Sequence, residues 1–412
     1  MRHVVLGLLS GGALIVSLAC GNNGGENAPI VHAQTVKEAV DSLPPTGGTV
    51  ALGIGVWNSG YNSTEFITKP NVTIRGSGMP GYNPTFTAMS GGTIVQGPLY
   101  ASSGADYFAV QDLGVDAGSA YINAQNGGIA TDAFAIFNNG QVVGAPQLES
   151  PRIENVSCLG SSPTAAVHCM LVENVNHAYI KNVVTVMNCH GLVLKGTNST
   201  VNGVYARGHG IDSILVKSDN YAPSSMDDLS NITIEPLIAP GDTKGIIIGG
   251  IAAPVSNIGI SGAIIRSPFA WGIDVKGASS ATPATAVTLS NITVEYEGGS
   301  PTVGYCLQFV EYVSNVNINN LNCSNMVSGI APVAPASGAF GNFTVKNSQF
   351  TKIATDGINT YGQWSISDTS FGSIAGNGIV AFSGVTTISG DTFTNIGGSD
   401  TYSAGGSFVV LP

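Results

Sequence analysis

One short pattern recurs along the chain and restricts what it can fold into. Residues 229–234 read Leu-Ser-Asn-Ile-Thr-Ile, and this alternation of apolar and polar side chains indicates a strand with one buried face. Close copies begin at Val255, Leu289 and Val313, at intervals of 24 to 34 residues, and looser copies begin at Pro70 and Gly341. A single strand of this kind cannot bury its face alone. Repetition at this period therefore predicts a solenoid of ten or more coils that share one core.

A second repeat is a Gly-Ile pair that precedes the next strand unit by about 10 to 20 residues. It occurs at Gly272, Gly329, Gly357 and Gly378. Because glycine permits a sharp bend, we expect at least two strands in each coil, separated at this pair.

A third repeat consists of large and small apolar residues. Phe350, Phe371 and Phe393 follow one another at spacings of 21 and 22 residues, and Cys158 and Cys323 occupy the same slot. We expect these side chains to stack inside the solenoid, because neighbouring coils lie about 4.8 Å apart.

Asparagines stand next to the strand units. Asn231 belongs to an Asn-Ile-Thr triplet, which matches the pattern of a glycosylation acceptor. Stacking of these asparagines, with each amide bonded to the neighbouring coil, is the interpretation favoured over a sugar attachment.

These repeats resemble those of the right-handed parallel β-helix proteins of the pectate-lyase-like superfamily, over roughly residues 35–400. The resemblance implies an all-β fold, a single-stranded solenoid over residues 35–412, and the activity of a polysaccharide lyase or a polygalacturonase-type hydrolase. A short helix is predicted from Thr35, with Glu38 completing a capping box. We expect this helix to cap the N-terminal end of the solenoid.

The first residues predict export. Residues 1–19 have the length and apolarity of a signal peptide. The sequence around Cys20 resembles a lipobox, which predicts a lipid on Cys20, a tether over residues 20–34 and an outer-membrane or cell-surface lipoprotein. The alternative is an ordinary secreted protein.

Five cysteines follow Cys20. This odd number leaves at least one thiol free or paired between chains. Cys158, Cys189 and Cys323 are interpreted as small apolar core residues in preference to disulfide partners. Their spacing suggests no metal site.

Ionisable residues are scarce, at 9% of the chain, so their clustering in residues 168–217 points to a site. This window holds four of the six histidines and a local charge of +2, within a chain of net charge −11. A basic patch on an acidic, exported protein favours an anionic polysaccharide and makes nucleic acid an improbable partner.

Segments that begin at His190, His209, Lys244 and Trp271 can be laid over one another. In that alignment Lys195, Asp212, Asp274 and Lys276 point outward on one face. Lys217 joins them only if the strand has a bulge near Ser213.

Two reactions would use this face. In β-elimination on a uronic acid chain, Lys195 or Lys217 is the predicted base, His209 and Asp212 are further catalytic candidates, and Arg207 holds the sugar carboxylate. In hydrolysis, Asp212 and Asp274 act as the two carboxylates, two coils apart. His190, Trp271 and Lys276 complete the predicted substrate-binding set. The Gly-His-Gly triplet at His209 resembles a motif of the polygalacturonase-type hydrolases, but its companion motifs are missing.

The sequence therefore favours an acidic-polysaccharide lyase, with a hydrolase, an epimerase and a non-catalytic glycan-binding or structural protein as alternatives. A monomer is expected. Asp112, Asp116 and Asp132 form an acidic series that suits a cation site or a catalytic site of a different layout, but turn and strand-edge positions explain it better. A calcium requirement stays open.

Overall fold

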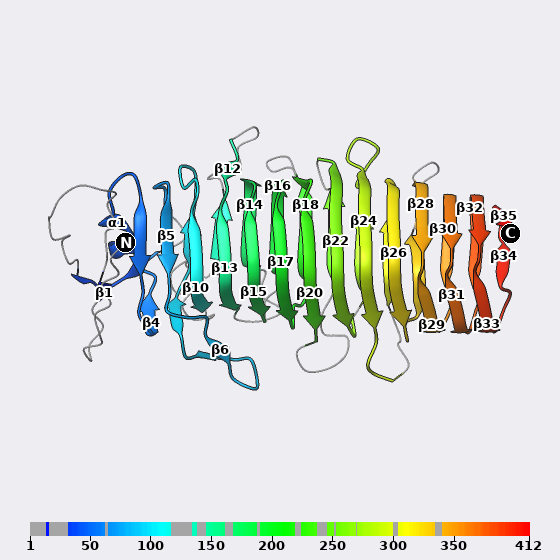
Figure 1. The fold of residues 1–412 in the computed structure, drawn as a ribbon, viewed down its shortest axis with the longest axis horizontal. Coiled ribbons are helices and arrows are strands. Elements are labelled where there is room, and N and C mark those ends of the chain that lie inside the picture. The colour runs from blue at the N-terminus through cyan, green and yellow to red at the C-terminus, as the bar shows by residue number, and fades with distance from the viewer. Residues whose placement is uncertain are drawn as a thin grey trace.

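The protein is described by a computed structural model. It covers residues 14–15, 32–61, 65–116, 134–137, 146–160, 168–187, 190–218, 224–236, 245–250, 253–268, 270–299, 304–333 and 340–412. In this part of the chain 31 strands join in one continuous sheet that winds into stacked coils. Figure 1 shows the coils following one another along a single axis from the blue N-terminal end to the red C-terminal end. The predicted parallel β-helix is therefore confirmed.

The first coils contain short strands. They are β3 (Gly48–Ala51), β4 (Gly55–Asn58), β5 (Val72–Arg75), β8 (Thr93–Gln96), β9 (Leu99–Ala101), β11 (Phe134–Phe137) and β12 (Leu148–Glu149). Outside this sheet, β1 (Leu14–Ile15) pairs with β2 (His32–Ala33), and β6 (Gly81–Tyr82) pairs with β7 (Met89–Ser90), both antiparallel.

The middle coils alternate between two series of strands. The first series is β10 (Ala109–Asp116), β13 (Arg152–Leu159), β15 (Tyr179–Val186), β17 (Thr200–Arg207), β20 (Asp228–Glu235), β22 (Val255–Arg266), β24 (Ala284–Glu295) and β26 (Val313–Ser324), with β19 (Ser224–Ser225) before β20. The second series is β14 (His168–Asn176), β16 (His190–Thr197), β18 (Asp212–Ser218), β21 (Ile246–Gly250), β23 (Trp271–Lys276), β25 (Tyr305–Val310) and β27 (Ser328–Val333).

The last coils repeat the same plan with shorter connections. Their strands are β28 (Phe340–Lys346), β29 (Gln349–Ile353), β30 (Ile358–Ser367), β31 (Ser370–Ile374), β32 (Ile379–Ser389), β33 (Thr392–Ile396), β34 (Thr401–Ser403) and β35 (Ser407–Leu411).

Helix α1 (Val36–Asp41) begins where the sequence predicts a helix. Thr35 is its N-cap and accepts a hydrogen bond from the backbone N–H of Glu38, while the Glu38 carboxylate accepts one from the backbone N–H of Gln34. The apolar face of α1 joins the main core, and the helix lies at the N-terminal end of the stack (Figure 1). That α1 serves as a cap stays a prediction. Among the described residues, no helix has the length and apolarity needed to cross a membrane.

The register confirms the predicted ladders. Ile273, Ile330, Ile358 and Ile379 occupy one inward row. The rings of Phe350 and Phe371 stack at 5.3 Å between centroids, and those of Phe371 and Phe393 at 4.9 Å.

Asparagine side chains also bond between coils as predicted. The amide of Asn231 donates to Asn202, and the amide of Asn320 donates to Asn291, both at 2.8 Å. Asn231 and Asn291 have φ near +55°, a conformation that asparagine tolerates better than most residues. These asparagines therefore hold the bends of successive coils together.

The prediction for two of the cysteines is wrong. Cys158 forms a disulfide with Cys169, and Cys323 forms one with Cys306. Both bridges lie inside the solenoid, where a bend brings the two Cα atoms within 5.9 Å. Cys189 lies outside the described residues.

Candidate active site

The candidate site lies on the outer side of the second strand series. In β16, β18, β21 and β23 the residues Leu192, Ile214, Ile246 and Ile273 occupy one inward row. The next residue in each strand points outward. This outward row runs through Leu171, Val193, Leu215 and Ile247, and it ends in Asp274 and Gln308. An apolar stripe therefore leads to a buried acid.

The register corrects one part of the sequence alignment. His190 lies level with Asp212 and not with His209. Asp212 is therefore not in the row of Asp274 as the sequence alignment predicted, because Asp274 is level with Leu215. The turn before β18 is three residues longer than the sequence alignment assumed, and these residues carry His209 away from the strand. The same register brings Lys217 onto the outward side, because Leu194 pairs with Val216 and Lys195 and Lys217 follow as the next residues.

His168, His190 and Asp212 form a row at the start of three successive strands. The two imidazole rings stack at 5.0 Å, and Nδ1 of His190 lies 3.1 Å from Oδ2 of Asp212. The Asp212 side chain is only 3% exposed. Its other oxygen, Oδ1, is buried and has no hydrogen-bond partner among the described residues.

Asp274 lies two coils further along. Its side chain is 4% exposed, and its Oδ2 is 3.8 Å from Nζ of Lys276. Burial raises the pKa of Asp274 to about 6, the cation of Lys276 opposes that rise, and the negative charge of Asp212 adds to it. Like Asp212, it has a buried Oδ1 with no hydrogen-bond partner in the described part of the chain. The two carboxyl groups thus interact, and each has one buried oxygen without a hydrogen bond among the described residues.

A mixed-charge row borders these carboxylates. Nζ of Lys195 lies 2.9 Å from Oε2 of Glu173, and both side chains are about one-tenth exposed. The structure therefore largely encloses this ion pair. Gly249 separates Lys217 from Lys276 in register, and a Cβ at Gly249 would lie 3.0 Å from the Lys276 side chain. Glycine thus makes room for the Lys276 stem.

His209 lies inside the solenoid and is fully buried. Its Nε2 is 3.0 Å from the Thr185 hydroxyl and 3.1 Å from the Thr185 carbonyl oxygen. A Cβ at Gly191 would lie 2.8 Å from that same nitrogen, so the Gly-His-Gly triplet packs against another glycine. This placement favours a structural role, and a catalytic role for His209 stays a prediction.

Arg207 ends β17, on the neighbouring face. Its guanidinium lies 4.2 Å from the centroid of the Phe86 ring and 3.6 Å from the Glu235 carboxylate. Glu235 also binds Arg266 at 2.8 Å, so Arg207 belongs to a row of alternating charges. Binding of a sugar carboxylate by Arg207 stays a prediction.

Trp271 packs against the apolar stripe of the outward row. Trp271 lies three residues before Asp274 and is level with Tyr305 on the following coil. It is therefore close to Asp274 in sequence, and Tyr305 lies beside it on the next coil. The substrate-binding role of Trp271 stays a prediction.

The predicted acidic series does not form a cluster in the described residues. Asp112 accepts hydrogen bonds from Arg75 and Asn155, and Asp132 lies outside the described part. No group of three or more His, Cys, Asp and Glu side chains suited to a metal ion occurs among the described residues.

Comparison with solved structures identifies similar folds. The chain is similar to the A-modules of the Azotobacter vinelandii mannuronan C-5 epimerases AlgE6 and AlgE4, with TM-scores of 0.56 and 0.54 at 15% and 13% identity. Each comparison covers 92% of this chain and 94% of the epimerase module. It is also similar to the catalytic domain of a GH87 alpha-1,3-glucanase in complex with tetrasaccharides, with a TM-score of 0.59 at 13% identity, over 97% of this chain and 70% of that one.

The chain shares the parallel β-helix fold of these proteins. At these identities the likeness extends to the fold alone. No protein-family profile and no curated protein sequence matches the chain. These neighbours are carbohydrate-active enzymes, an epimerase and a glucanase.

Proposed function

We propose that this protein hydrolyses a polysaccharide, with Asp274 as the general acid and Asp212 as the general base. The observation that carries the proposal is the pair of shielded carboxyl groups, each with one oxygen that has no hydrogen-bond partner in the described part of the chain. Two carboxyl groups of different protonation state are what glycoside hydrolysis requires. The raised pKa of Asp274, about 6, suits the group that must carry a proton.

In this reaction protonated Asp274 gives its proton to the glycosidic oxygen while the bond from that oxygen to the anomeric carbon breaks. Asp212 takes a proton from a water molecule whose oxygen bonds to the same carbon. His190, 3.1 Å from Asp212, orients the base. Asp212 and Asp274 lie two coils apart, about 10 Å along the axis, and Asp274 is level with Leu215, three residues beyond Asp212 along the strand. The two groups still interact across this offset, because the negative charge of Asp212 contributes to the raised pKa of Asp274.

The carboxylates are shielded from solvent in this structure, so a glycan needs the outer face to open before it can reach them. Exclusion of water after binding would then strengthen the electrostatic effects of both groups.

The test is to replace either acid with its amide. Asp274→Asn and Asp212→Asn are expected to lower turnover by at least about a hundredfold, the usual scale for acid–base catalysis. Reducing ends and ultraviolet absorbance are measured together on neutral glucans, pectate and alginate. New reducing ends without absorbance support hydrolysis. Full activity in both amide variants would contradict these roles, and a chain that binds but never cleaves would favour the non-catalytic alternative.

A lyase acting by β-elimination on an acidic polysaccharide is the second candidate. It is favoured by the cations of Lys195, Lys217 and Lys276 beside the acids, and by the likeness to mannuronan C-5 epimerases. Absorbance on alginate or pectate, lost in Lys217→Ala, would select it. Calcium dependence is checked in the same assay by adding a chelator.

We also propose that the protein is exported as a monomer, either anchored by lipid on Cys20 or secreted. Two internal disulfides support an oxidising compartment, because such bonds are rare in the cytosol. The segment predicted to be a signal peptide and tether lies almost entirely outside the described residues.

A further inference from the structure

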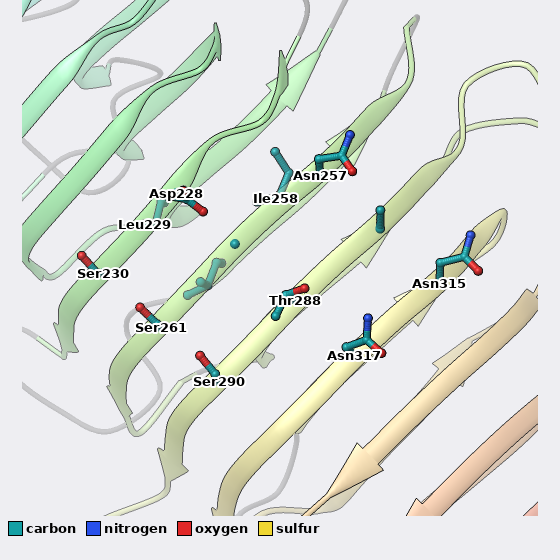
Figure 2. Close-up of a pocket in the computed structure, with 13 residues that line it drawn as sticks. Asp228, Leu229, Ser230, Asn257, Ile258, Ser261, Thr288, Ser290, Asn315 and Asn317 are labelled. Atoms are coloured by element: carbon teal, nitrogen blue, oxygen red, sulfur yellow. The ribbon is translucent and has the colours of Figure 1, made fainter.

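A groove of about 650 Å³ lies on a different face from the two carboxylates. It crosses β20, β22, β24 and β26 of the first strand series, as Figure 2 shows. Asp274 on β23 and Thr288 on β24 belong to successive strands of the same region of the solenoid. The groove is therefore near the candidate active site along the axis but faces another direction.

Three rows of polar or small side chains line the groove and run along the solenoid axis. Ser230, Ser261 and Ser290 form one row in register. Asp228, Gly259, Thr288 and Asn317 form the second. Asn257, Ala286 and Asn315, each with φ near +55°, form the third at a bend. Figure 2 shows the serines following one another from strand to strand.

Four of these polar side chains are available for a ligand, whereas Ser230 and Asn315 bond to other coils. Ser261, Thr288, Ser290 and Asn317 make no side-chain hydrogen bond within the part of the chain that the structure describes. The asparagines of the adjacent bend differ, since Asn320 donates to Asn291. At Gly259 the absent side chain leaves the space that the Asp228 carboxylate occupies, because a Cβ there would lie 2.5 Å from its Oδ1.

The side chains that line the groove indicate which class of ligand it would bind. Hydroxyl and amide groups both donate and accept hydrogen bonds, as sugar hydroxyls do. The only charged side chain in the lining is Asp228, so an anionic ligand would meet repulsion and no compensating cation. Serine recurs in one row on three successive coils, about 4.8 Å apart. An extended polymer of repeating units can use such a series better than a small molecule can.

We propose that this groove is a second, non-catalytic binding site for a neutral polysaccharide chain that runs along the solenoid axis. It goes beyond the proposed hydrolysis, since it needs neither Asp212 nor Asp274. It would hold a polymer beside the active-site face and raise its local concentration there.

The test measures binding by the full chain carrying Asp274→Asn, so that cleavage does not interfere. Affinity electrophoresis uses soluble mixed-linkage β-glucan as the neutral polymer and alginate as the anionic one, and calorimetry uses an alpha-1,3-glucan tetrasaccharide. Thr288→Arg fills the groove and is expected to weaken neutral-glucan binding by about tenfold or more. Asn317→Ala removes one hydrogen-bonding side chain and is expected to weaken it about two- to tenfold.

The matched control is Thr387→Arg. Thr387 is in the same outward row as Thr288, several coils beyond the groove, and this variant is expected to bind like the parent. The inference is overturned if Thr288→Arg and Asn317→Ala bind as the parent does, if neither neutral glucan binds the parent, or if the groove variants lose alginate binding instead. None of these outcomes depends on whether the wild-type chain cleaves a glycan, so the two proposals fail separately.

Discussion

Asp274 is a residue whose charge is costly where it lies. Its carboxyl group is almost completely buried, with one weak cationic contact to Lys276 and one oxygen without a hydrogen bond among the described residues. An apolar residue there would avoid the cost of burying a charged group. Such a cost is typical of functional sites, where stability is given up for reactivity.

Asp274→Asn is therefore expected to stabilise the fold at neutral pH. The folded pKa is raised to about 6 from an ordinary value of 3.8, so the folded state binds more protons and stability falls as pH rises from about 4 to about 6. Removing the titrating group should raise the free energy of unfolding by about 1 to 3 kcal/mol at pH 8.

Urea unfolding at pH 8 and at pH 4 measures this effect. The gain should shrink at pH 4, where the wild-type carboxyl group is protonated in the folded state and about half protonated in the unfolded chain. A variant that is less stable than the wild type at pH 8 would show that the carboxylate is stabilised by contacts outside the described residues.

At the scale of single elements, two slots of each coil determine the packing at the bend. From Gly329 onward, the glycine of each Gly-Ile pair faces a ring of the phenylalanine ladder. A Cβ at Gly329 would lie 2.7 Å from the Phe350 ring, and one at Gly357 would lie 2.8 Å from the Phe371 ring. Large rings and absent side chains are thus matched coil by coil.

Phe371 is the middle ring of the ladder, and Phe371→Ala tests how much this ring contributes to the free energy of unfolding. The ring is 1% exposed, and its loss leaves a cavity between two stacked neighbours. We expect a loss of about 3 to 5 kcal/mol in the free energy of unfolding, measured by urea denaturation. Tyr402→Ala, at a ring that is 51% exposed, is the control and should change stability by less than about 1 kcal/mol. Equal effects would mean that the ladder does not dominate packing in these coils.

The same two slots explain why the disulfides were missed. Cys306 takes the glycine slot and Cys323 takes the ring slot, one coil before Gly329 and Phe350. The sequence revealed both repeats separately, because each follows from its own spacing. It did not reveal that the slots face each other, since that depends on the angle of the bend. Read together, the repeats would have indicated the pairing.

The Cys306–Cys323 disulfide can be replaced with the glycine–phenylalanine pair that occupies the same two positions in the next coil. Cys306→Ser with Cys323→Ser should lower the free energy of unfolding by about 2 to 4 kcal/mol. Cys306→Gly with Cys323→Phe copies the next coil and should lose less. Thermal unfolding of both variants, with and without a reducing agent, measures the difference. If the Gly–Phe variant proves the less stable of the two, the slots are not interchangeable.

For the whole molecule, the sequence predicted the architecture better than the site. Periodic strands and ladders determine a solenoid because every coil must repeat the one before it. The outward alignment of Lys195, Asp274 and Lys276 followed from the same repeat. The position of His209 did not, because the length of one turn is not periodic. The groove at Thr288 could not be predicted either, because its residues come together only through the register of neighbouring strands.

Because the coils stack at a regular spacing, the axial distance between two residues follows from the number of coils between them. Two carboxylates on neighbouring coils are separated by one step of about 4.8 Å along the axis, and those two coils apart by twice that. One step is near the spacing of retaining hydrolases, and two steps are near that of inverting ones. In a solenoid such as this, gain or loss of one whole coil between two acids would change the stereochemistry of a reaction while leaving every local contact of the remaining coils intact.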